Sequence, residues 1–233
     1  MIKKDILSKS WWKYLCVIFL TYTVIAGFLM PVPALPHLHE TIRNLYFHVC
    51  MWFAMMYIFT VSLVYSIKYL NNPKEDYDII ASQSTYTGLV FGVLGLVTGA
   101  LWATYSWEGG TGGVSWISDP KINGAFVALL SYFAYVVLRN AMDDEQKRAR
   151  ISAVYNIFAY VMMIVFIMIY PRLSNVDSMH PGNGGNPGFN SYDLDSHMRL
   201  VFYPAVIGWL LLCTWIASVN IRTERIKRYF HNI

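Results

Sequence analysis

Three tryptophans lie in a glycine-rich stretch between Trp102 and Lys121. They are Trp102, Trp107 and Trp116, and the run Gly-Gly-Thr-Gly-Gly lies between the last two. Indole rings offer large flat contact areas and an N–H group, so this stretch could hold a flat apolar ligand with polar edges. The same rings could instead form the aromatic belt that membrane proteins place at the bilayer surface. We therefore predict a ligand platform or a belt at 102–121, in a loop too rich in glycine to be helical.

Two histidines could supply a metal ligand beside these rings. His48 lies near one end of an apolar segment, and His180 opens a segment rich in glycine and proline. A polar ring at membrane depth usually faces the helix bundle and marks a functional site, although a carbonyl of a neighbouring helix could also satisfy it. Two neutral imidazoles can hold a haem iron from opposite faces, which makes His48 and His180 candidate axial ligands. His197 is the alternative to His180, whereas His37 and His39 are expected at the surface.

One carboxylate, Asp119, follows the aromatic stretch and precedes Pro120 and Lys121. Asp is favoured at the N-cap of a helix and Pro in its first turn, so Asp119-Pro120 predicts a helix start. This role leaves Asp119 able to orient a ring N–H or the edge of a ligand as well.

The composition indicates that these residues belong to a membrane protein. Of the 233 residues, 56% are hydrophobic and 14% are charged, with a mean hydropathy of +0.39. A spanning helix needs about 20 mostly apolar residues. Six segments meet this criterion, at about 12–30, 45–69, 80–103, 121–140, 151–171 and 199–221. We therefore predict an all-α polytopic membrane protein in which residues 1–233 form a single integral membrane domain.

The distribution of basic residues predicts the orientation of these spans. Fourteen of the 18 Lys and Arg residues lie on the side of the two termini, which includes the loops at 70–79 and 141–150. Cytoplasmic loops of membrane proteins collect Lys and Arg, so both termini are expected in the cytoplasm. The loops that hold Trp107 and His180 are then outside, and the proline-containing segment 31–44 beside them is expected to be extended.

Other motifs restrict the classes of function. Cys16, Cys50 and Cys213 lie far apart in or beside apolar runs, which is typical of buried small side chains rather than of disulfides or thiolate metal sites. There is no Cys-x-x-Cys-His motif for covalent haem attachment and no Walker motif for ATP. A stripe of glycines favours close helix packing over the broken helices of a permease. Its members are Gly88, Gly92, Gly95 and Gly99.

Several motifs together resemble a known family. The segments Thr98-Gly-Ala-Leu-Trp102, Trp107-Glu-Gly and Trp116-Ile-Ser-Asp-Pro-Lys121 are similar to the tryptophan-rich "WWD" outer loop of the CcmC/CcsA family of cytochrome c biogenesis. Tyr-Phe-His48-Val and Met-His180-Pro-Gly resemble the two histidine motifs that flank this loop. Ser118 departs from the pattern, because the family usually has a second tryptophan before the aspartate. The number of spans favours the CcmC branch.

The resemblance implies a protein of the bacterial inner membrane that binds haem b without a covalent bond at its periplasmic face. His48 and His180 would be the axial ligands, and Trp102, Trp107 and Trp116 with Asp119 would form the platform. The protein would pass haem to a haem chaperone, alongside ABC transporter subunits and a small accessory membrane subunit, and would not itself be an enzyme. The alternatives are a membrane b-type cytochrome that transfers electrons, which would hold histidine pairs near mid-membrane, and a small-molecule permease.

Overall fold

The computed structural model describes residues 9–35, 38–108, 116–173 and 194–231, and in these residues it is helical without strands. Within these ranges six helices are long and apolar enough to cross a membrane, which confirms the predicted all-α class. The long helices are α1 (Trp11–Leu29), α2 (Leu45–Asn71), α3 (Glu75–Ala103), α4 (Pro120–Asn140), α5 (Glu145–Met163) and α6 (Ser196–His231). The short turns are η2 (His39–Asn44), η3 (Thr104–Glu108), η4 (Trp116–Ser118), η5 (Ile164–Ile169) and η6 (Tyr170–Arg172).

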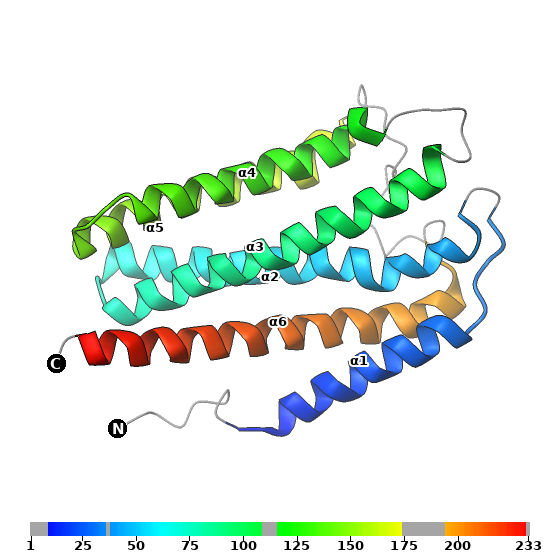
Figure 1. Ribbon diagram of the computed structural model, residues 1–233, viewed down its shortest axis with the longest axis horizontal. Coiled ribbons are helices and arrows are strands. Elements are labelled where there is room, and N and C mark those ends of the chain that lie inside the picture. The colour runs from blue at the N-terminus through cyan, green and yellow to red at the C-terminus, as the bar shows by residue number, and fades with distance from the viewer. Residues whose placement is uncertain (1–8, 36–37, 109–115, 174–193, 232–233) are drawn as a thin grey trace.

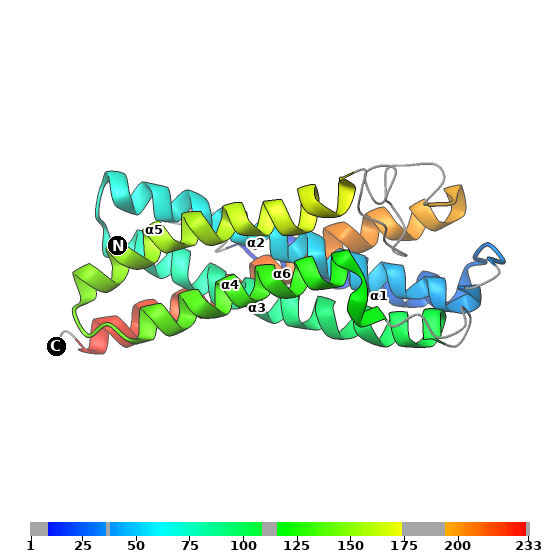
Figure 2. The same cartoon turned by 90° about the horizontal axis from the view of Figure 1, so that it is seen from above.

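The helices run side by side along the long axis of the molecule (Figure 1). The helix α2 is central and packs against α3, α5 and α6, whereas α1 packs mainly on α6 and α4 on α5. Figure 2 shows α4 and α5 as neighbours that overlap in Figure 1. The helices α1 and α6 respectively begin and end at the same end of the bundle.

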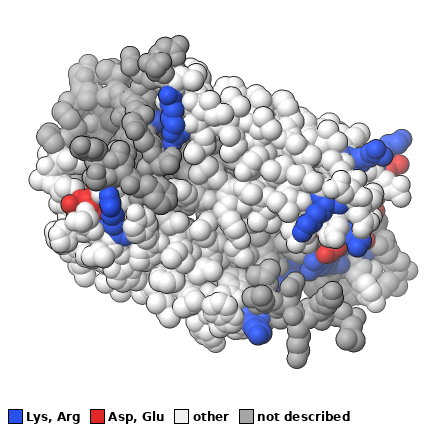
Figure 3. All heavy atoms as spheres, turned by 180° about the vertical axis from the view of Figure 1, so that it is seen from behind, with Lys and Arg blue, Asp and Glu red and all other residues white. Residues whose placement is uncertain are grey.

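The two ends of the bundle, called the basic end and the His48 end, differ in their residues. The basic end comprises the turn at 72–74, the turn at 141–144 and the last turns of α6. The His48 end comprises η2, the start of α2, the end of α3 and the starts of α4 and α6. On the face seen in Figure 3, charged side chains lie toward both ends, and the band between them is uncharged. This distribution is expected where lipid surrounds the middle of the bundle, so the chain is a multi-pass membrane protein.

The predicted glycine stripe lies along the contact between α2 and α3. A β-carbon at Gly95 would lie 3.0 Å from Trp52 of α2, and one at Gly99 would lie 2.4 Å from Cε1 of His48. Farther along the same face, Gly92 and Gly88 meet Met55 and Phe59. The absence of side chains on this face lets the two backbones approach closely, which confirms the packing interpretation of the stripe.

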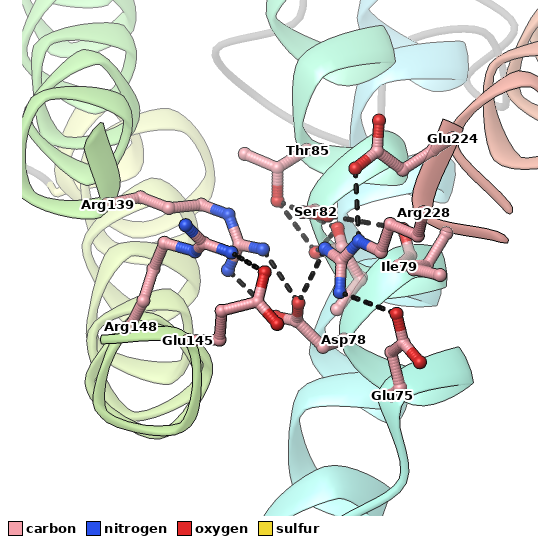
Figure 4. A network of polar contacts seen from close by, with 12 residues as sticks. Glu75, Asp78, Ile79, Ser82, Thr85, Arg139, Glu145, Arg148, Glu224 and Arg228 are labelled. Carbon is pink, nitrogen blue, oxygen red and sulfur yellow. Dashed lines mark hydrogen bonds and ion pairs between the residues drawn. The ribbon is translucent and has the colours of Figure 1, made fainter. Parts of the chain in front are cut away.

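A buried ion-pair cluster joins three helices at the basic end (Figure 4). The guanidinium of Arg139, near the end of α4, donates two hydrogen bonds of 2.7 Å to the carboxylate of Asp78 in the first turn of α3. Arg228 of α6 approaches the same carboxylate at 3.1 Å. The side chains of Arg139 and Asp78 are only 5% and 6% exposed. Arg139 lies near the end of the span predicted at 121–140 and Asp78 lies in the loop predicted at 70–79, and the sequence did not predict their pairing.

Two predicted loops are partly helical. Residues 102–108 contain no glycine, and the helix continues as α3 and the π-helical turn η3 before the glycines begin. Residues 31–35 have no regular secondary structure, and residues 39–44 form the 3-10 turn η2, in which Glu40 and Arg43 pair at 2.6 Å.

The helix α5 begins six residues earlier than expected, because the Asp144 side chain accepts a hydrogen bond from the amide of Lys147 and Glu145 pairs with Arg148. The helix α6 extends ten residues beyond the predicted limit at 221.

Candidate functional site

His48 lies in the first turn of α2 and is buried against α3, with 7% of its surface exposed. Its Nδ1 lies 2.9 Å from the carbonyl oxygen of Gly95 and 3.3 Å from Oγ1 of Thr98. The Thr98 hydroxyl itself lies 2.8 Å from the carbonyl oxygen of Leu94, to which it donates. The α3 backbone therefore holds the imidazole on one side, as the alternative of a histidine bound to a neighbouring carbonyl had anticipated.

This hydrogen bond selects the tautomer of His48. A carbonyl oxygen only accepts, so Nδ1 carries the proton and donates it to Gly95. In the neutral ring the lone pair then belongs to Nε2. Histidines that bind metals commonly donate the other ring N–H to a backbone carbonyl in this manner, which orients the ring and makes it more basic. The contact to Gly95 thus leaves His48 in the form that a metal ligand requires.

Two tryptophans stand edge-on to the His48 ring. The centroid of Trp102 lies 6.0 Å from that of His48 at an interplanar angle of 75°, and the centroid of Trp52 lies 6.3 Å away at 82°. The indole N–H of Trp102 donates to Oγ1 of Thr41 at 3.0 Å, which ties α3 to η2. The structure therefore places the predicted Trp102 beside His48. It also adds Trp52, which lies four residues after His48 on the same face of α2.

Two polar side chains anchor the segment before α2, and neither was predicted as part of the site. Asn44 donates through Nδ2 to the carbonyl oxygen of Thr98 at 3.3 Å. Arg43 donates to the carbonyl oxygens of Gly27 and Met30, each at 2.7 Å. These hydrogen bonds satisfy two backbone carbonyl groups at the C-terminal end of α1. These contacts connect α1, η2 and α3 around the turn that carries His48.

Asp119 is buried at the start of α4 and is its N-cap. Its Oδ1 accepts from the amide of Lys121 at 2.9 Å and from that of Ile122 at 3.4 Å, and Pro120 occupies the first turn. The predicted helix start is therefore confirmed. Asp119 also fixes the point at which the chain leaves the aromatic stretch and enters the membrane span.

The other predicted site residues are described only in part. Trp107 lies in η3 and Trp116 begins η4, but the positions of their side chains fall outside the described residues. His180 and His37 also fall outside them. His197 is exposed in the first turn of α6.

The packing of α6 bears on His197 as a ligand. The first turns of α6 pack against α2 in a hydrophobic cluster that includes Met198 of α6 and Tyr46 and Cys50 of α2. At about 100° per residue, His48 lies on the face of α2 opposite to Tyr46 and Cys50. The start of α6, which carries His197, therefore packs on the side of α2 that faces away from His48. His39 is exposed, as expected, and has a positive φ of 43°.

We expect the close contact between Gly99 and His48 to be necessary for the position of the ring. In Gly99→Ala, the added methyl group would lie 2.4 Å from Cε1, so the imidazole must move from its hydrogen bond to Gly95. If His48 ligates a haem iron, displacement of this orienting contact should weaken haem binding about 10- to 100-fold, and haem titration of the purified variant would measure this loss. Gly208→Ala, whose nearest neighbours are side chains of α1, is the matched control and should bind as the wild type does. Unchanged binding in Gly99→Ala would mean that this contact does not set the ring position.

Comparison with known proteins identifies the family. The family model "Heme exporter protein C" (CcmC) matches residues 4–232. The chain belongs to this family. Membership supports a role in haem handling for cytochrome c biogenesis and agrees with the resemblance found in the sequence motifs.

Individual relatives carry two names. The chain is 23% identical to "Heme exporter protein C" of Rhodobacter capsulatus over 84% of its length and 77% of the relative. It is 26% identical to the protein of the same name from Bradyrhizobium diazoefficiens, over 81% of the chain and 68% of the relative. It is 32% identical to "Cytochrome c biogenesis protein CcsA" of Prochlorococcus marinus over 47% of the chain. That match spans about a third of the relative, 34% of its length.

Proposed function

We propose that this protein binds haem b non-covalently at the His48 end and delivers it to a haem chaperone during the biogenesis of c-type cytochromes. The single observation that carries the proposal is the hydrogen bond from Nδ1 of His48 to the carbonyl oxygen of Gly95. It orients the ring and leaves the lone pair on Nε2, which is the arrangement of an axial haem ligand. Family membership supports haem as the molecule bound.

Two tryptophans beside His48 are suited to apolar contact with a porphyrin. The edges of Trp52 and Trp102 border the imidazole, and Gly99 leaves the ring room on the side of α3. Aromatic side chains provide the apolar contact area that a macrocycle needs. We propose that Trp107 and Trp116 extend this surface and that Asp119 holds the helix start beneath it.

We propose His180 as the second axial ligand, with His197 as the alternative. His48 is fixed on a helix, whereas His180 is followed by Pro-Gly-Asn-Gly-Gly. Ordering such a segment costs about 1–2 kcal/mol of backbone entropy per residue, which weakens ligation on that face alone. His180 is then the ligand that dissociates from the iron when haem passes to an acceptor, and the position of the His48 ring does not change.

The proposal places the His48 end at the periplasmic face of the bacterial inner membrane and the basic end in the cytoplasm. The partners would be a haem chaperone, ABC transporter subunits that hydrolyse ATP, and a small accessory membrane subunit. The chain then acts as a haem-handling component and not as an enzyme.

Cysteine labelling tests this orientation. Ile117 is 63% exposed at the His48 end, and Asp143 is exposed in the turn between α4 and α5. Because Cys16, Cys50 and Cys213 are all buried, an impermeant thiol reagent should react mainly with introduced cysteines. In intact spheroplasts we expect labelling of Ile117→Cys, with Asp143→Cys labelled only after lysis. The reverse pattern would invert the topology.

Complementation tests the function itself. In a bacterium that lacks its own heme exporter protein C, expression of this chain should restore covalent haem in c-type cytochromes and haem on the chaperone. The His48→Ala variant should reach the membrane in equal amount and restore neither. Restoration of both by His48→Ala would contradict the proposal, whereas haem bound to the chain without transfer to the chaperone would reduce the function to haem binding.

A further inference from the structure

A cavity of about 550 Å³ lies at the basic end, far from His48, between the end of α2, the first turns of α5 and the last turns of α6. Its apolar wall includes Tyr69 and Leu70 of α2. Its polar wall includes Asp78 of α3, Lys147 and Arg150 of α5 and Arg228 of α6. We call it the basic-end cavity. None of its lining residues belongs to the candidate haem site around His48.

The acidic residues of the basic-end cavity are already neutralised. Asp78 binds Arg139 and Arg228, and the latter also approaches Glu75 at 3.4 Å (Figure 4). Glu145 pairs with Arg148 at 2.9 Å.

Lys147 and Arg150 differ from these arginines, because within the described ranges neither side chain has an ion-pair or hydrogen-bond partner. Two uncompensated cations at the mouth of a cavity favour an anionic ligand.

The surface of α5 that continues from these cations is apolar. Ile151 and Val154 follow Lys147 and Arg150 at helical spacing, and Phe158 lies one turn farther, so all five share one face. The three apolar side chains are 44%, 55% and 51% exposed. The face therefore begins with cations at the basic end and continues as an apolar stripe along a membrane-spanning helix.

We propose that the basic-end cavity and this face of α5 bind an anionic phospholipid from the leaflet on the side of the termini. The lipid phosphate lies against Lys147 and Arg150, and an acyl chain lies along Ile151, Val154 and Phe158. Basic pockets between membrane helices are suited to lipid head groups, because each Lys or Arg near the surface attracts the phosphate and acyl chains cover exposed apolar side chains. A free phosphate shares the head-group chemistry but would not use the apolar stripe.

Native mass spectrometry of the purified full chain in detergent tests the proposal, with phosphatidylglycerol and phosphatidylcholine as the probes. We expect the wild type to prefer phosphatidylglycerol. Each cation near a membrane surface contributes about a fivefold change in affinity, so Lys147→Gln/Arg150→Gln should bind phosphatidylglycerol about 30-fold more weakly. The control Arg222→Gln/Lys227→Gln removes the same charge from α6 outside the cavity and should stay within about twofold of the wild type.

Three outcomes would overturn the proposal. Wild-type affinity for phosphatidylglycerol in Lys147→Gln/Arg150→Gln would exclude the two cations as the binding site. An equal loss of affinity in the control would indicate attraction of the lipid to the total positive charge of this end and not to the cavity. Displacement of phosphatidylglycerol by millimolar glycerol 1-phosphate would indicate a site for free phosphate. If the double variant fails to fold, as judged by its melting temperature, the single variants carry the test with about fivefold losses expected for each.

Discussion

His48→Ala is expected to lower haem affinity by more than about 100-fold, because even residues that only orient a ligating histidine contribute 10- to 100-fold. The variant removes Nε2, the nitrogen that carries the lone pair for a metal when Nδ1 donates to Gly95. A methyl group cannot replace it as a ligand, and the low-spin absorption spectrum should disappear. Haem titration of the purified protein, followed by absorption spectroscopy, measures both effects.

Three single histidine variants and one double variant make the test specific. His39→Ala removes an exposed ring outside the site and should leave the spectrum unchanged. His180→Ala should lose or alter the low-spin spectrum if His180 is the second ligand. Loss of the spectrum in His197→Ala alone would move the second ligand to His197. A wild-type spectrum in the double variant His48→Ala/His180→Ala would refute bis-histidine ligation by this pair.

The largest expected effect on stability is that of Asp78→Ala, which should lower the free energy of unfolding by about 3–5 kcal/mol. The substitution leaves the guanidinium of Arg139, 5% exposed, in the bundle without its carboxylate. Arg228 loses one partner but keeps Glu224 at 3.1 Å. Denaturant or thermal unfolding in detergent, at one lipid composition throughout, measures the loss.

Two variants separate burial from simple loss of charge. Asp76→Ala removes a carboxylate two residues earlier, whose partner Arg225 is 45% exposed, and should change stability by less than about 1 kcal/mol. Asp78→Ala/Arg139→Met removes both buried charges and should recover most of the stability lost in Asp78→Ala. Equal losses in Asp76→Ala and Asp78→Ala would show that burial does not determine the energy of this pair.

The six spans could be predicted because each contains an apolar run long enough to cross a bilayer. The start of α4 could also be predicted, from Asp119 and Pro120. Most other helix ends could not, because polar residues extend a helix where caps and ion pairs satisfy them. Acidic Glu75, Asp76 and Asp78 suit the N-terminus of α3, where the helix dipole favours negative charge. Hydropathy counts these residues as loop.

Parts of the candidate site could be predicted from single residues. His48 and Trp102 stand out by type and position, and the glycine stripe indicates a close helix contact. Which residues meet across that contact depends on how α2 and α3 are aligned. The contact of His48 with Gly95 and the edge-on approach of Trp52 follow from that alignment and have no signature in the chain.

The ion pair of Asp78 with Arg139 was missed for a related reason. The two residues are 61 positions apart, and each alone resembles an ordinary charge at a helix end. Only the packing of α4 against α3 brings them together.

The most direct test of haem binding is the absorption spectrum of the wild-type protein purified from haem-replete cells, recorded before and after extraction with acidified acetone. We expect the low-spin spectrum of haem b, with all of the haem in the organic phase, because the chain has no Cys-x-x-Cys-His motif to hold it covalently. Purification of a folded protein that neither carries haem nor binds added haem would contradict the proposed function.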